Sequence, residues 1–299
     1  MQLRPAQTSD IPAIKGLSES IWDGGDYLPR LIADWISEGG VYTGIVNGEI
    51  VGVSRIRKLA EDEWWLEGLR IAVAQQGLGY GRELHNLTLD ELKRIGKGIV
   101  RFASADTNHS IPPALKSGFR EILRLPFTYA ELPHHKTIKS AWQAVLEENK
   151  ITVNAKATPQ LRELLKTASS IDYAGLIRQG WEFYNYSEER LNAWLGQSVV
   201  LTTSDKGEVK AAAVLSTDYQ RPHNLDLNML TGDKKTVRER IIPSLVAAAM
   251  VQPERFNDIY VCVPARYRDV LTGTGFQSAD FFRDQIVFEA EIAKLVPAY

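Results

Sequence analysis

Three glycines stand at alternate positions in the stretch AQQGLGYGRELHNL, at Gly77, Gly79 and Gly81. They follow an apolar run and precede a pattern typical of an amphipathic helix. Glycine allows a positive φ and lets another group approach the backbone without meeting a Cβ. The first N–H groups of a helix lack intrahelical acceptors and lie at the positive end of its dipole. The pattern therefore predicts a binding site for a phosphate-sized anion.

Two common phosphate-binding loops fit these residues poorly. The P-loop needs Gly-Lys followed by Ser or Thr, whereas Gly81 is followed by Arg82-Glu83. The dinucleotide fingerprint G-x-G-x-x-G places its third glycine one residue later than Gly81, and the elements before the glycines have an antiparallel pattern. A different kind of anion loop is therefore expected.

The elements around this loop alternate between helix and strand. The apolar spacing predicts a helix over residues 9–22, two strands over residues 39–56 joined at Asn47-Gly48, and a strand over residues 64–73. In this last strand, alternation would place Trp65, Glu67, Leu69 and Ile71 on one face. A helix to about residue 94, a strand over 98–104, Gly118-Phe119 and a strand over 125–132 complete the series. This order predicts an α/β fold built of layers.

The second half of the chain repeats the first at a shift of 157 residues. Gly118-Phe119 falls on Gly275-Phe276, and the segment LRIAV falls on DLNML. Such self-similarity indicates an internal duplication. The glycine loop at residues 76–81 falls on residues 233–238, which read DKKTVR and contain no glycine. Because the fold pattern persists without the glycines, we interpret them as functional. The alternative is that they only end a strand and begin a helix.

Composition limits the class of protein. The 299 residues carry a net charge of -2, which gives no general electrostatic attraction to nucleic acid, and no apolar run approaches the length of a membrane span. The N-terminal residues lack the apolar core of a signal peptide, so we expect a cytoplasmic protein, monomeric or homodimeric. The single cysteine, Cys262, has no disulfide partner in the chain, and no Cys/His cluster has zinc-ligand spacing, so no metal is expected.

The pattern Gln76-x-x-Gly79-x-Gly81, preceded by EGLRIAV and followed by the later Gly-Phe, resembles the coenzyme A signature of the GNAT superfamily of N-acetyltransferases. The resemblance covers residues 1–132. It implies tandem GNAT folds, each a mixed, mainly antiparallel twisted sheet flanked by helices. The N-terminal domain would span residues 1–138, and a degenerate GNAT-like domain would span 139–299. DYLP and EGLRIAV are also similar to histidine N-acetyltransferase-like proteins.

The resemblance also implies which residues bind acetyl-CoA. The backbone at Ile71, Ala72 and Val73 would pair with the pantetheine arm, and the N–H of Ile71 would hold the oxyanion. The N–H groups from Gln76 to Arg82 would hold the pyrophosphate. The Arg82 side chain would add a contact to a phosphate, or it is only a solvated residue of the helix. The cofactor-binding residues are then Ile71, Ala72, Val73, Gln76, Gly77, Leu78, Gly79, Tyr80, Gly81, Arg82 and Asn108.

Catalytic and acceptor roles follow from the same resemblance. Glu67 would accept the proton of the amine, and its alternative role is a structural ion pair. The position that often holds a general-acid tyrosine is occupied by Ala114. Asp26 and Tyr27 would shape the amine pocket, or they belong only to a glycine-rich turn. The histidines, His85 among them, are expected at the surface.

These roles predict an acetyl-CoA-dependent N-acetyltransferase acting on a primary amine of a small molecule, an amino acid or a peptide. The alternatives are a non-catalytic acyl-CoA sensor and a scaffold whose second domain recruits a partner.

Overall fold

The computed structural model describes residues 1–19, 21–133, 139–218, 221–252, 256–280 and 282–299. They form two compact units, each described separately below. The N-terminal unit contains Met1–Ser104, Asn108–Ile122 and Val287–Tyr299, and the C-terminal unit contains Ala105–Thr107 and Leu123–Ile286. The chain therefore enters the N-terminal unit again at its end. The domain boundary expected after residue 138 adjoins residues 134–138, which lie outside the described residues.

The N-terminal unit contains the elements expected from the sequence pattern, together with a first strand, a second helix and a short helix before Gly118 that the pattern did not predict. Its helices and strands are β1 (Gln2–Pro5), α1 (Ile11–Ser18), α2 (Leu28–Glu38), β2 (Val41–Val46), β3 (Glu49–Ala60), β4 (Glu63–Ile71), α3 (Tyr80–Ile95), β5 (Ile99–Ala105), α4 (Ile111–Lys116) and the start of β6 (Arg120–Glu131). The hairpin between β2 and β3 turns at Asn47 and Gly48, which both have positive φ, as its sequence predicts.

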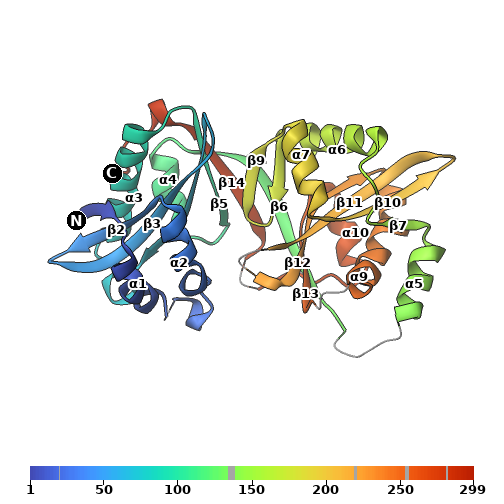
Figure 1. Cartoon of the computed structure of the whole chain (residues 1–299), viewed down its shortest axis with the longest axis horizontal. Helices are drawn as coiled ribbons and strands as arrows, with labels where there is room; N and C mark the ends of the chain where they lie inside the picture. The colour runs from blue at the N-terminus through green and yellow to red at the C-terminus, as the bar shows by residue number, and fades with distance from the viewer. Residues whose placement is uncertain (20, 134–138, 219–220, 253–255, 281) are drawn as a thin grey trace. The chain divides into compact units, whose positions relative to one another are not determined.

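Helices cover both faces of this sheet (Figure 1). On one face, Val53 of β3 packs in a buried cluster with Ile14 of α1 and Trp35 of α2. On the other face, a Cβ at Gly52 would lie 2.8 Å from the Leu84 side chain of α3. Alternate residues of β3 therefore face α1 and α2 on one side and α3 on the other.

A bulge interrupts β4 and changes which of its side chains share a face. Arg55 of β3 pairs with Glu67, but Val53 pairs with Arg70, so between these pairs β4 has two residues where β3 has one. Gly68 lies in this bulge with φ +70, and a Cβ there would lie 2.7 Å from the Trp35 ring. Glu67 and Arg70 therefore both face α1 and α2, and Ile71 faces α3. The common face expected for Glu67 and Ile71 is wrong, because strict alternation ignores the extra residue.

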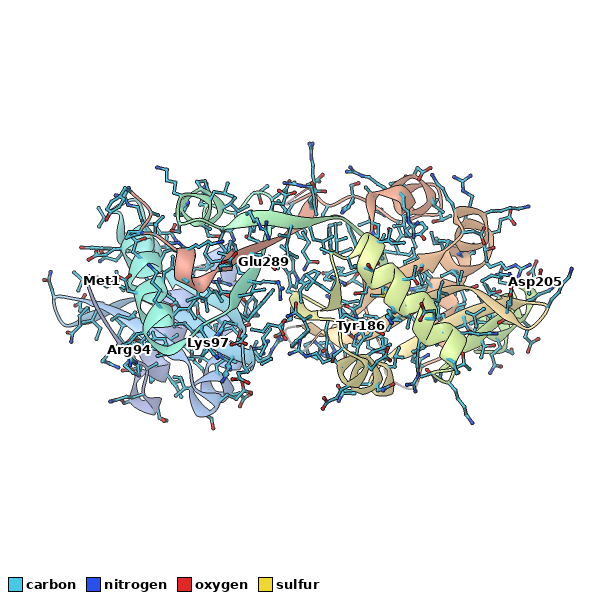
Figure 2. The ribbon with its side chains drawn as sticks, turned by 90° about the horizontal axis from the view of Figure 1, so that it is seen from above. Met1, Arg94, Lys97, Tyr186, Asp205 and Glu289 are labelled. Atoms are coloured by element: carbon cyan, nitrogen blue, oxygen red, sulfur yellow. The ribbon has the colours of Figure 1, made fainter. Side chains whose placement is uncertain are left out.

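The last strand of the chain, β14 (Asp284–Glu291), lies beside β5 in the sheet order, and its residues from Val287 onward belong to the N-terminal unit. The buried guanidinium of Arg101 on β5 donates to Glu63 at 3.0 Å and to Glu289 at 2.9 Å. Glu289 comes from β14, as Figure 2 shows. Burial of this charged group is compensated by two carboxylates, which join β4, β5 and β14.

After its first helix, the C-terminal unit follows the element order of the N-terminal unit, with an added two-stranded hairpin between its second and third helices. Its elements are the rest of β6, α5 (Lys139–Glu148), β7 (Ile151–Val153), α6 (Pro159–Asp172), β8 (Leu176–Gln179), β9 (Glu182–Asn185), α7 (Glu188–Gly196), β10 (Val199–Asp205), β11 (Glu208–Asp218), β12 (Arg221–Gly232), α8 (Lys234–Thr236), a π-helical turn (Val237–Ile241), α9 (Ile242–Met250), β13 (Asp258–Cys262), α10 (Arg268–Thr272) and the start of β14.

The strand order in this unit is β6-β13-β12-β11-β10-β7, and its β12–β13 pair is parallel, like the β4–β5 pair. Its other described strand pairs in this sheet are antiparallel. Both units thus have the mixed, mainly antiparallel sheet flanked by helices that the sequence predicts. Among the described residues, no helix has both the length and the hydropathy needed to span a membrane.

Candidate functional site

The glycine loop leaves β4 and forms the N-terminus of α3. Gly77 and Gly79 adopt φ +80 and +85, a region that favours glycine. Gly79 is the N-cap residue, and its carbonyl accepts the N–H of Glu83 at 3.1 Å. The N–H groups of the next three residues therefore have no acceptor within the helix. A Cβ at Gly77 or Gly79 would meet no described atom within 4 Å, so the space beside the loop is open.

Gln76 differs from the other residues of the expected anion site because its N–H groups already donate hydrogen bonds within the chain. Its backbone N–H donates to the carbonyl of Val73 at 3.2 Å, and its side-chain amide donates to the carbonyl of Ile71 at 3.1 Å. These two bonds fix the start of the loop against the end of β4. The open N–H groups are thus on the later residues, Gly77 to Arg82.

The end of β4 has a free edge beside this loop. In the described chain, the parallel ladder between β4 and β5 runs only from Glu63 to Trp65 on β4. Ala72 donates its N–H to Val51 of β3 at 2.9 Å. Neighbouring N–H groups of a strand point to opposite edges, so the N–H of Ile71 points away from β3, toward the side of β5. This edge can pair with an extended ligand.

The loop before α2 contacts β4 through an ion pair on the α1–α2 face. Asp26 accepts hydrogen bonds from Arg70 at 3.0 and 3.3 Å, and its side chain is only 1% exposed. The Arg70 guanidinium also lies 5.2 Å from the centre of the Tyr27 ring, and burial raises the pKa of the Tyr27 hydroxyl. Asp26 and Tyr27 are therefore brought together at β4, with Arg70 as the partner that the sequence pattern did not identify.

Glu67 lies on the same face and is bound to arginines. Its carboxylate accepts a hydrogen bond from the buried Arg55 at 3.1 Å and lies 3.8 Å from Arg57 Nε. Arg55 also pairs with Glu38 and lies over the Trp35 ring. The ion pair between Glu67 and Arg55 is the contact expected if Glu67 has only a structural role.

Residues 14–119 match the family described as the acetyltransferase (GNAT) family. The N-terminal unit is a GNAT domain. The sequence matches no curated protein.

Solved structures with the same fold extend the likeness to the whole chain. A candidate acetyltransferase from Thermoplasma acidophilum has a TM-score of 0.63 at 15% identity, over 97% of this chain and 100% of its own. A GCN5-related N-acetyltransferase from Sphaerobacter thermophilus has a TM-score of 0.61 at 12% identity, over 97% and 95%. A tandem GNAT protein from the clavulanic acid biosynthesis pathway has a TM-score of 0.58 at 10% identity, over 97% and 98%. The fold is thus that of tandem GNAT proteins.

Three further positions of the GNAT domain lie on or against α4. Asn108 is exposed, and its side-chain oxygen accepts the N–H of Ser110 at 2.9 Å, which forms a turn that leads into this helix. Ala114 is buried and offers no acidic group. His85 of α3 lies 3.0 Å from the hydroxyl of Ser117, and burial lowers its pKa to about 4. The surface position expected for His85 is wrong, because the side chain is buried against Ser117 at the end of α4.

The C-terminal counterpart of the glycine loop carries a carboxylate side chain at the helix N-terminus. Asp233 is the N-cap residue of α8, and its carboxylate accepts the N–H of Thr236 at 2.8 Å. Hydrogen bonds from the side chain and the backbone N–H of Thr236 lower the pKa of Asp233 below its ordinary value. Asn228, at the position equivalent to Ile71, is fully buried and accepts hydrogen bonds from Arg178 and Gly180. In this unit, side-chain hydrogen bonds are thus present at both positions that correspond to the glycine loop and to Ile71.

Proposed function

We propose that the GNAT domain binds acetyl-CoA and transfers its acetyl group to a primary amine of a small molecule, an amino acid or a peptide. The observation that supports this proposal most directly is the open loop at Gly77 and Gly79, placed at the N-terminus of α3 and beside the free edge of β4. Open N–H groups at a helix N-terminus suit a pyrophosphate, and a strand edge suits a pantetheine arm.

The residues present fit the two parts of the cofactor. The N–H groups from Gly77 to Arg82 would hold the pyrophosphate, and the open space beside Gly77 and Gly79 leaves room for it. The backbone of Ile71, Ala72 and Val73 would face the arm, and Asn108 lies at the start of α4. Gln76 would act by holding the loop. Bound acetyl-CoA supplies the thioester, and the N–H of Ile71 would stabilise negative charge on its carbonyl oxygen.

The acceptor amine would lie on the face that carries Glu67 and Arg70. An ammonium ion must lose a proton before the amine attacks a thioester, and Glu67 is the proposed proton acceptor. Arg55 would then orient its carboxylate. Asp26 would act through Arg70, which it binds, and Tyr27 would form part of the pocket wall.

A non-catalytic acyl-CoA sensor is the second candidate. It is favoured by the alanine at position 114, where a general acid is often found in GNAT relatives, and by the arginine partners of both acceptor-side carboxylates. The sensor and the enzyme share the cofactor site and differ only in turnover.

A thermal-shift titration with acetyl-CoA, followed by a panel of amines, tests this proposal. Ligand at about 100 times its dissociation constant should stabilise the protein by about 2.7 kcal/mol. Gly79→Val should abolish the shift. Gly175→Val is the matched control, because Gly175 also has positive φ and open space around it but lies in the C-terminal unit. An undiminished shift in Gly79→Val contradicts the cofactor site, and binding without turnover on any amine favours the sensor.

A further inference from the structure

The last residues of the chain pack against the GNAT domain between α3 and α4. Val296 donates its N–H to the carbonyl of Ser117 at 3.1 Å, next to the end of α4. Ala298 donates its N–H to the side-chain oxygen of Asn86 on α3 at 2.8 Å, and its carbonyl accepts the Asn86 amide at 3.4 Å. The side chain of Lys116 donates to the carbonyl of Tyr299 at 2.7 Å. We refer to residues 295–299 as the C-terminal tail.

The C-terminal tail borders a hollow that begins at the glycine loop. The hollow has a volume of about 510 Å³, and its lining comes from the loop, from α3 and from the tail: Leu78, Gly79, Arg82, Glu83, Asn86, Ala298 and Tyr299. With a rise of 1.5 Å per residue, the helix axis between Gly79 and Asn86 is about 10 Å long. The hollow therefore extends from the N-terminus of α3 along the helix to the tail.

The groups exposed around the hollow suit a nucleotide. Tyr299 and Leu78 are 85% and 63% exposed, although both are large apolar side chains. Arg82 is exposed, and among the described residues it has no carboxylate partner, whereas Glu83 pairs with the amino group of Met1. An exposed aromatic ring can stack on a base, and an arginine can pair with a phosphate.

We propose that the C-terminal tail forms one wall of the cofactor site and contacts the phosphoadenosine end of coenzyme A, with Tyr299 beside the base and Arg82 beside a phosphate. The inference rests on the proposed function, because it assumes that the pyrophosphate lies at the glycine loop. Asn86 is a positioning residue that holds the tail in place. The tail follows β14, so the chain returns from the C-terminal unit to complete the cofactor site of the GNAT domain.

The test measures the affinity of the full chain for two probes. Coenzyme A contains the phosphoadenosine group, and 4′-phosphopantetheine lacks it. Calorimetry serves for coenzyme A, and saturation-transfer NMR serves for the weaker probe. Tyr299→Ala and Asn86→Leu should each weaken coenzyme A binding about tenfold, the loss expected from one base–aromatic contact, and leave phosphopantetheine binding unchanged. Asp90→Leu, on an exposed part of the same helix beyond the tail, should change neither affinity.

The outcomes separate this inference from the proposed function. If the wild-type chain binds neither probe, the proposed function fails. If it binds coenzyme A and both variants bind it equally well, the role of the tail fails and the function stands. Equal weakening for both probes also overturns the inference, because the tail would then act through the loop. Tyr299 is so exposed that its variant is expected to fold normally, which keeps the test valid if Asn86→Leu is unstable.

Discussion

The carboxylate of Asp26 and the guanidinium of Arg70 form a two-point ion pair, with N–O distances of 3.0 and 3.3 Å, that is almost excluded from solvent. This pair attaches the loop before α2 to β4. The same Asp26 oxygen that receives the longer bond also accepts the N–H of Leu28, the first residue of α2, at 3.2 Å. An amine that contacted Asp26 directly would have to share a carboxylate that already has these partners.

Arg70→Met should therefore destabilise the protein strongly. The substitution leaves the carboxylate of Asp26 buried without its cation, which typically costs about 3–5 kcal/mol. The free energy of unfolding from denaturant titration measures the loss. Arg94→Met is the control, because Arg94 pairs with Glu91 at the surface, as Figure 2 places it, and little change is expected. Equal losses in the free energy of unfolding for the two substitutions would show that the buried pair stabilises the protein no more than the surface pair does.

Gly68→Ala tests the bulge that places Glu67 and Arg70 on one face. A Cβ at this position would lie 2.7 Å from the Trp35 ring and would require a residue other than glycine at φ +70. We expect a loss of about 2–4 kcal/mol in the free energy of unfolding. In Gly16→Ala the new Cβ meets no described atom within 4 Å, so this helical control should be neutral or slightly stabilising. A Gly68→Ala protein of wild-type stability would contradict the bulge geometry.

The glycine loop could be predicted from the sequence because its conformation is local. The positive φ at Gly77 and Gly79 and the helix that follows depend on the residue types themselves. The shared face of Glu67 and Arg70 could not be predicted, since a bulge depends on how β3 pairs with β4. The position of β14 beside β5 could not be predicted either, because the contact of Arg101 with Glu289 joins residues far apart in the chain.

The partners of charged side chains were the other feature that sequence patterns left open. The family resemblance identified Glu67 and Asp26 as carboxylates near the site, and the structure pairs them with Arg55 and Arg70. Strand pairing and the approach of the loop to β4 create these pairs, and neither leaves a signal in the local sequence. The burial of His85 was missed for a related reason, because its contact with Ser117 joins residues far apart in the chain.

His85 should make the stability of the protein depend on pH. Burial lowers its pKa from 6.5 to about 4. Below pH 6.5 the unfolded chain binds a proton that the folded chain does not, so stability falls as the pH is lowered from 6.5 to about 4. The loss is at most about 3 kcal/mol. His85→Gln should remove this part of the pH dependence, whereas His109→Gln, at an exposed position, should retain it. Parallel curves for all three proteins would contradict the buried, neutral state of His85.

The whole chain should bind one molecule of coenzyme A. The carboxylate of Asp233 already accepts the N–H of Thr236 at the equivalent helix N-terminus, where it would repel a phosphate. Calorimetry should give a single site, and a second site would contradict the degenerate role of the C-terminal unit. Asp233→Ala removes a helix cap and should lower the free energy of unfolding by about 1 kcal/mol.

Glu67→Gln tests the proposed proton acceptor. Glutamine keeps the volume of the side chain but cannot accept the proton of the amine, so turnover should fall by about 10²–10⁴-fold while acetyl-CoA affinity is retained. Glu63→Gln is the matched control, since Glu63 lies on the same strand and its buried carboxylate also pairs with an arginine, Arg101. Both substitutions weaken a buried ion pair and should lower the melting temperature.

Only the loss of turnover per folded molecule distinguishes the two variants of β4. If Glu67 is the base, Glu67→Gln loses turnover and Glu63→Gln retains it at the same temperature and pH. The wild-type rate should also rise with pH along the titration of a single group, and in Glu67→Gln the dependence should move toward the pKa of the amine. If both variants are destabilised but retain wild-type turnover, Glu67 is a structural partner of Arg55, and the proton is accepted elsewhere.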